Sequence, residues 1–328
     1  MRWFARRLGF YVFAIWVALT INFLLPRLMP GSPIAGLLQH LSPAQLSANP
    51  GIIQTYQALL GGGHHSLWSD YVTYLSRIVH FNFGLSTSNY PTPVSEVIGR
   101  TLPYSIFLVG VGFILAFGIG IAIGMVAAWR RGRFVDSVFV PAFMVVGAFP
   151  AFFLALLGLY FLGLRAGWFP LQHAYDNDVI PGWNWAFISS AFRHSQLPIL
   201  VIVAAYAGGW VLNMRTVMIN TIGEDYVAMA QAKGLRDRRV MTRYAGRNAI
   251  LPPLNGFAAL FASAVGGLVF IEYIFSYPGV GFTLQNAVLG NDYPLAQAIL
   301  VVLSVCVIVA NLIMDVLNFV LDPRLRTG

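Results

Sequence analysis

The amino-acid sequence predicts an all-α integral membrane protein with six transmembrane helices. Charged residues make up only 10% of the 328 residues, whereas apolar residues make up 58%. A typical soluble domain has roughly 25% charged residues, so most of the surface of this protein must face lipid. A third observation is that six apolar runs reach the length of about 20 residues that a helix needs to cross a bilayer.

These runs set the predicted order of the spans along the chain. They cover residues 8–28, 102–129, 135–164, 197–219, 251–271 and 295–321. The first run begins like a secretory signal peptide, because Arg2, Arg6 and Arg7 precede it. It is longer than the apolar region of a signal peptide, however, and no cleavage site with small residues follows it. We therefore expect an uncleaved helix that anchors the chain.

The distribution of basic residues predicts that both chain termini are cytoplasmic. Arg and Lys are enriched in the cytoplasmic loops of membrane proteins. The segments on one side hold Arg2, Arg6, Arg7, Arg130, Arg131, Arg133, Lys233, Arg236, Arg238, Arg239, Arg243, Arg247, Arg324 and Arg326. The segments on the opposite side hold only Arg27, Arg77, Arg100, Arg165 and Arg193. Arg215 lies near the inner end of the fourth run, within reach of the lipid headgroups.

This topology makes residues 29–101 a long extracytoplasmic segment and residues 165–196 a second one. Trp168, Trp183 and Trp185 in the second segment suit the membrane–water interface, where tryptophan is enriched. All six histidines fall in these two segments: His40, His64, His65, His80, His173 and His194. They are scattered along the chain, so we expect no metal site.

Composition and motifs argue against several functions. The net charge of +8 comes from short Arg clusters between apolar runs, so we expect no nucleic-acid binding. The single cysteine, Cys306, rules out a disulfide or a thiolate metal site within the chain. The sequence also lacks a Gly-x-x-x-x-Gly-Lys-Ser/Thr motif, which cradles nucleotide phosphates. We therefore expect no ATP hydrolysis, no catalytic residue and no cofactor in this chain.

The predicted cytoplasmic segment 221–250 has the pattern of a helix, a glycine turn and a second helix. Residues 224–233 are rich in helix formers, and Gly234 suits the position just after a helix C-terminus. A second helical stretch with five Arg residues follows and ends at Pro252-Pro253. The segment is therefore expected to fold as a compact elbow.

Small residues in the first of these helices favour close contact with another protein. Ala228, Ala230 and Ala232, with Gly234, leave a slim ridge that suits a groove on a partner. A basic cytoplasmic loop is more often simply solvated and serves to fix the topology. Composition alone leaves both interpretations open.

The segment resembles the EAA loop of ABC importer permeases, in the longer form of the dipeptide/oligopeptide/nickel family. The resemblance is carried by Asp225-Tyr226-Val227, Ala230-Gln231-Ala232-Lys233-Gly234-Leu235, Arg247-Asn248-Ala249 and Leu251-Pro252. There is one departure from the pattern. Short-form permeases have a glutamate where this chain has Ala228, and the acids Glu224 and Asp225 lie further upstream.

Further segments resemble the same family, in the same order along the chain. They are 25–33, Gly84-Leu85-Ser86, Pro93-Val94, 127–132 with Asp136, 272–281, Asp292-Tyr293-Pro294 and Asp322-Pro323-Arg324. The form Phe275-Ser276-x-Pro278-Gly279-x-Gly281 and the long first extracytoplasmic segment resemble the B permease (OppB/DppB type) rather than its C partner.

The resemblance implies a type I ABC importer permease fold in a prokaryotic plasma membrane, forming half of a translocation pathway for peptides. It implies a second homologous permease, two ATP-binding-cassette ATPase subunits or domains that bind ATP and Mg, and an extracytoplasmic solute-binding protein. It also implies a coupling helix that docks on the ATPase. The residues expected in this role are Glu224, Asp225, Tyr226, Ala230, Ala232, Lys233, Gly234 and Leu235.

Two further groups are candidates for the pathway or its gate. Glu272, Pro278, Gly279 and Gly281 follow the fifth run, and a structural or gate-closing role is favoured over substrate binding. Asn311, Asp315 and Asn318 share one face of the sixth run. For this polar stripe, hydrogen bonding to a neighbouring helix is favoured over a proton pathway.

The cargo and two other classes of protein remain as alternatives. Nickel, an oligosaccharide or another small solute could replace peptide, since specificity lies largely in the separate binding protein. A secondary transporter is the distant alternative, but the sequence shows no matching inverted halves and no paired midplane acids. A membrane enzyme would need a cluster such as His-Glu-x-x-His, which the sequence lacks.

Overall fold

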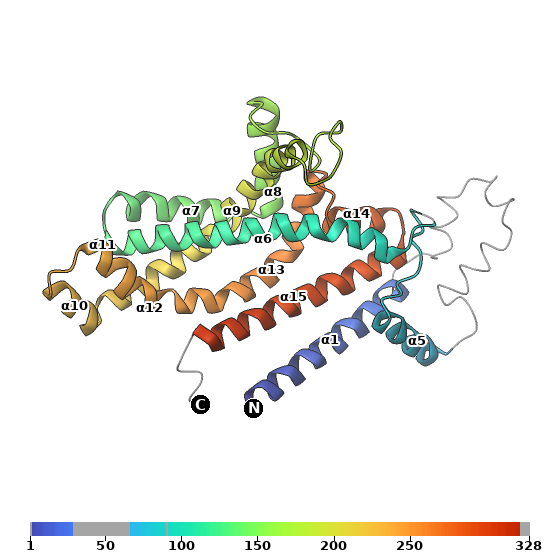
Figure 1. Cartoon of the computed structure of the whole chain (residues 1–328), viewed down its shortest axis with the longest axis horizontal. Coiled ribbons are helices and arrows are strands. Elements are labelled where there is room, and N and C mark those ends of the chain that lie inside the picture. Colours follow the sequence, from blue (N-terminus) through green and yellow to red (C-terminus); the bar gives the residue numbers. More distant parts are fainter. Residues whose placement is uncertain (1, 29–65, 90, 322–328) are drawn as a thin grey trace. The chain divides into compact units, whose positions relative to one another are not determined.

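The computed structural model describes residues 2–28, 66–89 and 91–321, which are mainly helical (Figure 1). The side chains of 2–8, 25–28, 255, 258–266, 314 and 317–321 lie outside the description. So do most of the predicted extracytoplasmic segment 29–101, the side chain of Asn318, and Asp322-Pro323-Arg324. The chain divides into two compact units, residues 1–103 with 279–309 and residues 104–278 with 310–328.

Helices cover all six predicted apolar runs. Five of the runs lie in α1 (Arg2–Leu28), α6 (Val94–Trp129), α9 (Trp185–Ile222), α13 (Leu251–Ile274) and α15 (Tyr293–Leu321). Within the described residues, α6, α9 and the Tyr293–Ile313 part of α15 are each long and apolar enough to cross a membrane. The described apolar part of α1, Gly9–Leu24, is shorter. The structure therefore confirms a mainly helical protein with helices long and apolar enough to cross a membrane. The number six stays a prediction.

The predicted run 135–164 is helical, but it is bent. This run forms α7 (Val140–Gly147) and α8 (Ala151–Gly158), extended by π-helical segments on either side and bent by 102° at a short break. The break lies before Pro150, whose ψ of 139° is not helical. Proline lacks the N–H that would continue the helix and disfavours a helical conformation at the residue before it.

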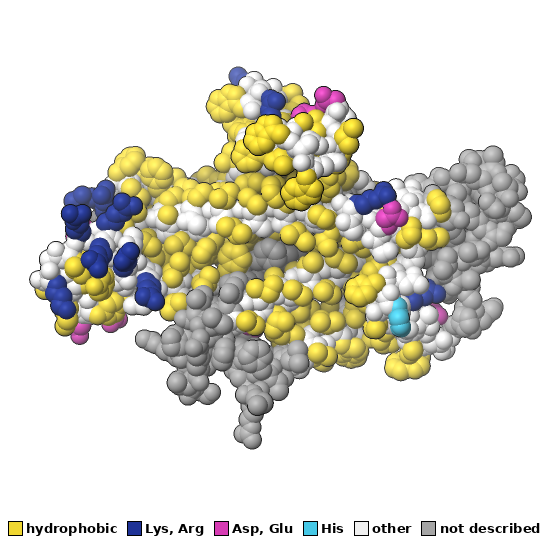
Figure 2. Space-filling model, viewed as in Figure 1, with side chains coloured by type: hydrophobic (Ala, Val, Ile, Leu, Met, Phe, Trp, Pro, Cys, Tyr) yellow, Lys and Arg dark blue, Asp and Glu magenta, His cyan; other side chains and the backbone are white. Residues whose placement is uncertain are grey.

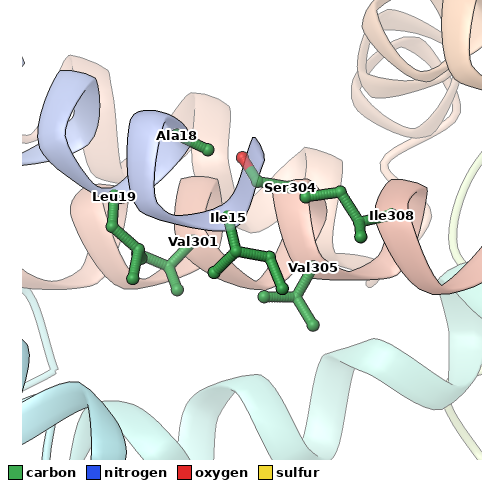
Figure 3. A pocket seen from close by; sticks show the side chains of 7 residues that line it. All are labelled: Ile15, Ala18, Leu19, Val301, Ser304, Val305 and Ile308. Carbon is green, nitrogen blue, oxygen red and sulfur yellow. The ribbon is translucent and has the colours of Figure 1, made fainter. Parts of the chain in front are cut away.

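The first unit joins segments from both ends of the chain. The side-chain amides of Asn22 in α1 and Gln297 in α15 each donate to the other residue's backbone carbonyl, at 2.9 and 3.1 Å. Helix α5 (Leu67–Val79) packs on α1, where the Thr20 and Tyr71 hydroxyls lie 2.7 Å apart. A shallow apolar groove also runs between α1 and α15 (Figure 3). It is lined by Ile15, Ala18, Leu19, Val301, Ser304, Val305 and Ile308.

A fully buried carboxylate, Asp292, holds further segments of this unit together. Its two oxygens accept hydrogen bonds from the Ser86 hydroxyl at 2.5 Å, the Ser88 N–H at 2.9 Å and the Leu295 N–H at 3.2 Å. Asp292 thereby caps α15 and holds the loop that precedes α6. Two of the short family-like segments of the sequence, 84–86 and 292–294, are therefore neighbours in the structure.

In the second unit, glycines bring helix backbones together. A β-carbon on Gly124 of α6 would lie 2.5 Å from the carbonyl oxygen of Val211 in α9, and one on Gly208 of α9 would lie 2.4 Å from that of Phe143 in α7. Gly120 makes a similar approach to Ala207. Small residues permit such packing between membrane helices, where burial from water supplies little driving force. Helices α6, α7 and α9 are thus packed backbone to backbone.

We predict that Gly208→Val destabilises this unit, because its β-carbon would overlap the backbone of α7. The expected loss is about 1–3 kcal/mol, as for other overpacked interiors, measured as a lower thermal midpoint of the purified protein in detergent. Gly209→Val is the matched control, since a β-carbon on Gly209 meets nothing within 4 Å. Equal midpoints for the two variants would contradict the proposed packing.

Candidate functional site

The predicted elbow is present at the end of α9. After Gly223, helix α10 (Asp225–Ala232) begins, and Gly234 follows it with a φ of +71°. The Gly234 N–H donates to the Gln231 carbonyl at 2.9 Å, and the Leu235 N–H to the Ala230 carbonyl at 3.4 Å. A glycine in the left-handed conformation is the usual C-terminal stop of a helix. The prediction of a helix that ends at Gly234 is confirmed.

The second arm of the elbow returns the chain to the membrane-crossing helices. It consists of α11 (Asp237–Arg239), a π-helical segment Val240–Gly246 and α12 (Arg247–Ala249), and it leads directly into α13. Pro252 and Pro253 lie in the first turn of α13, where a missing backbone N–H costs nothing. The two prolines thus begin the next helix as well as ending the elbow.

One face of α10 is buried against the rest of the unit. Val227 and Ala230 are at most 2% exposed, and they pack in one cluster with Met214 and Met218 of α9. The same cluster includes Val240, Ala245 and Ala249 from the second arm, and Ile121 and Ala128 from α6. Ala230 therefore faces inward, so the prediction that it forms part of an exposed ridge is wrong.

The opposite face of α10 is exposed and includes two alanines. Residues three, four and seven positions apart share a helix face, and Asp225, Ala228, Met229 and Ala232 have this spacing. All four are exposed, Met229 to 60%. We call these four residues the outward face of α10. Glu224, Tyr226, Lys233 and Gly234 are exposed at its margins, and Leu235 is half-buried.

Exposed basic side chains lie in the second arm of the elbow. Arg236, Arg238, Arg239, Arg243 and Arg247 in the second arm are all exposed. Figure 2 shows a group of Lys and Arg side chains of the second unit at the end that carries α10 and α11. The elbow therefore presents a short exposed helix next to a strongly basic arm.

Comparison with known proteins assigns the chain to a family. The family described as "Binding-protein-dependent transport system inner membrane component" matches residues 120–327, which include the whole elbow. The chain belongs to this family. It is therefore a transport permease and a membrane protein, and its resemblance to ABC importer permeases is confirmed.

Similar proteins extend the match over nearly the full chain. The oligopeptide transport system permease protein AppB of Bacillus subtilis is 31% identical over 308 residues, 93% of each chain. The dipeptide transport system permease protein DppB of Lactococcus lactis is 28% identical over 326 residues, 99% of each chain. A Brucella suis biovar 1 protein named as a peptide permease is 33% identical over 317 residues, 94% of each chain.

The predicted gate residues of the permease differ in their surroundings. In the second unit, Glu272 is only 2% exposed, and its backbone carbonyl accepts from the Tyr277 N–H at 2.8 Å in the turn before Pro278. Burial, and then the charge of Glu272, raise the pKa of Tyr277. In the first unit, Gly279 caps α14 (Val280–Leu289) and Gly281 is buried within it. The structure thus places these residues in packed turns and helix starts.

The polar stripe of the sixth run is only partly described. Asn311 and Asp315 lie one turn apart on α15, and both side chains are half-buried. The third member, Asn318, lies outside the described side chains. The role of the whole polar stripe stays a prediction.

Two polar clusters of the permease escaped the sequence prediction. In one, Asp136 pairs with Arg215, so this arginine has a partner within the protein besides any contact with headgroups. An arginine within an apolar run requires such a partner. The position of Arg215 in the fourth run is therefore the signal from which an ion pair could have been predicted. The other cluster, Asp176 with Ser190 and His194, joins the loop after residue 165 to α9.

His194 in this second cluster is buried rather than solvated. It is 8% exposed, with Nδ1 2.9 Å from the Gln172 carbonyl oxygen and Nε2 3.1 Å from Asp176 Oδ1. The Ser190 hydroxyl donates to Asp176 Oδ2 at 2.6 Å. Since the serine bonds the aspartate and not the histidine, the three residues form no nucleophilic triad. Their arrangement instead fastens the loop to α9.

The Asp176 carboxylate makes this attachment dependent on pH. Hydrogen bonds from Ser190 first, and from His194 second, lower the pKa of Asp176 below its ordinary value of 3.8. A lowered pKa means that the stabilisation is complete at neutral pH and is lost as the pH falls through the pKa of the folded state.

We therefore predict that Asp176→Asn lowers the thermal midpoint of the permease at pH 7, and that this difference shrinks below about pH 4. The measurement is the midpoint of both proteins in detergent across the acidic range. Asp178→Asn, at an exposed position of the same loop, is the control and should leave the midpoint unchanged. A difference between parent and Asp176→Asn that persists at low pH would contradict this account.

Proposed function

We propose that this chain is the B-type permease of an ABC importer and forms half of a translocation pathway for peptides. Family membership supports the transport role. The relatives that match over nearly their whole length carry names that specify oligopeptide and dipeptide transport. Nickel, an oligosaccharide or another small solute is the alternative cargo.

The proposed topology has six membrane spans and cytoplasmic termini in a prokaryotic plasma membrane. Helices over all six apolar runs support the number of spans. The bent pair α7 and α8 counts as one span in this scheme. The gathering of Arg and Lys around α10 supports a cytoplasmic location for the elbow.

The outward face of α10 carries the proposal. A helix of two turns whose inner face is fixed in a buried cluster, and whose outer face is exposed and includes two alanines, suits insertion into a groove on another subunit. We propose that this subunit is an ATP-binding-cassette ATPase. Closure of two such subunits on ATP and Mg would then move α10 and shift the permease between inward-open and outward-open states.

The remaining partners follow from the same proposal. A second homologous permease completes the pathway, and an extracytoplasmic binding protein delivers the peptide. ATP and Mg bind to the ATPase subunits, and this chain catalyses nothing itself. The margin of arginines around α10 favours an ATPase surface with acidic side chains beside its groove.

The first test is purification of the tagged chain from native membranes in mild detergent, with identification of the co-purified subunits. We expect a second permease and ATPase subunits, and uptake of labelled di- and oligopeptides by the complex in liposomes. Recovery of the chain alone, in several detergents, would overturn the importer proposal. Uptake of nickel or an oligosaccharide instead of peptide would overturn only the cargo.

We predict that Ala232→Glu lowers peptide uptake by about tenfold or more, because an unpaired carboxylate buried at an interface costs several kcal/mol. Gly234→Pro should have a similar effect, since proline cannot adopt the positive φ that this turn requires. Both variants should still be inserted in the membrane, which immunoblotting of membrane fractions checks. Gln231→Glu, exposed on the flank of α10, is the control and should transport normally. Unchanged uptake in Ala232→Glu would contradict docking by this face.

A further inference from the structure

A cluster of hydrogen bonds around Asp136 joins three segments of the second unit. Oδ1 accepts from Arg215 Nε at 2.5 Å, and Oδ2 accepts from Arg215 Nη2 at 3.1 Å. Oδ2 also accepts from the backbone N–H of Gly132 at 2.9 Å. We call these three residues the Asp136 cluster. It connects the turn after α6, the segment that leads into α7, and α9.

The geometry of this cluster is specific. Two parallel bonds between a guanidinium and a carboxylate fix both side chains in direction as well as distance. The Asp136 side chain is 9% exposed and that of Arg215 is 25% exposed, so water does little to replace a missing partner. Gly132 has a φ of +77°, a conformation that favours glycine. Its N–H is thereby aimed at the carboxylate.

The same turns of α9 also hold α10. Met214 and Met218, on either side of Arg215 in the sequence, pack against Val227 and Ala230 of α10. One turn before Arg215, Val211 packs with Val140 and Ala127 from α7 and α6. The end of α9 is thus fixed on one side to α6 and α7 and on the other side to α10.

We propose that the Asp136 cluster makes α10 move together with the adjoining ends of α6 and α7. Asp136 and Arg215 are then positioning residues for the coupling of ATP hydrolysis to peptide import. Apolar side chains alone can slide over one another, whereas the paired guanidinium and carboxylate resist rotation and sliding of α9 against α7. This inference rests on the proposed function, in which α10 receives its movement from an ATPase.

The test uses the complete transporter in liposomes and measures both ATP hydrolysis and peptide uptake. Asp136→Asn and Arg215→Gln should assemble and hydrolyse ATP, but the peptide imported per ATP should fall by about tenfold, within the usual range of coupling between sites. The double variant should be no worse than either single variant, because both remove the same interaction. Arg133→Gln is the control, since it removes one positive charge from an exposed position of the same loop.

Every outcome of this experiment either supports or overturns the proposed role of the Asp136 cluster. A normal import ratio in Asp136→Asn and Arg215→Gln would overturn the role of the cluster, and so would losses that multiply in the double variant. A merely structural role would lower assembly and hydrolysis together and leave the ratio unchanged, which would also overturn the proposal. If Ala232→Glu on the outward face likewise leaves uptake normal, the proposed docking of α10 on the ATPase fails first. If Ala232→Glu uncouples while the cluster variants do not, only the present inference fails.

Discussion

The backbones of α6, α7 and α9 approach one another so closely at Gly120, Gly124 and Gly208 that no β-carbon fits at these positions. The rest of the second unit depends on this constraint. It fixes the position of α9 along α7. It therefore also determines which residues of α9 face the segment that contains Asp136. The same helix α9 continues to Ile222, and α10 begins directly beyond that end. The short elbow is held in place because the helices that carry it are closely packed.

Three carboxylates in the described part of this protein hold polar clusters near helix ends. Asp292 caps α15, Asp176 fastens a loop to the start of α9, and Asp136 binds the arginine near the end of α9. This placement agrees with the cost of burying charge in lipid. Each carboxylate has several donors, so each holds a turn or loop in one arrangement. The apolar middle portions of the helices pack closely, while the polar contacts near their ends fix the arrangement of the turns and loops.

Much of the fold could be predicted from the sequence because its signals are local. An apolar run of 20 residues becomes a helix in lipid whatever its neighbours are, and Gly234 ends α10 for reasons contained within one turn. Pro150 was a local signal too, and it explains the bend within residues 135–164, although this bend was not predicted. The pairs Asp136 with Arg215 and Ser86 with Asp292 are separated by 79 and 206 positions in the sequence. Pairing over such distances depends on helix packing, which one sequence does not specify. The inward direction of Ala230 was missed for the same reason, since only the packed cluster decides which face of α10 is buried.

The central claim is that the outward face of α10 docks on an ATP-hydrolysing subunit. The most direct measurement replaces Met229, whose side chain is 60% exposed, by a photoreactive amino acid in cells that contain the whole transporter. On illumination we expect a covalent adduct with the ATPase subunit, and no such adduct when the same group replaces Ile180, which is 81% exposed in the loop before α9. An adduct with the ATPase from position 180, and none from position 229, would contradict the account.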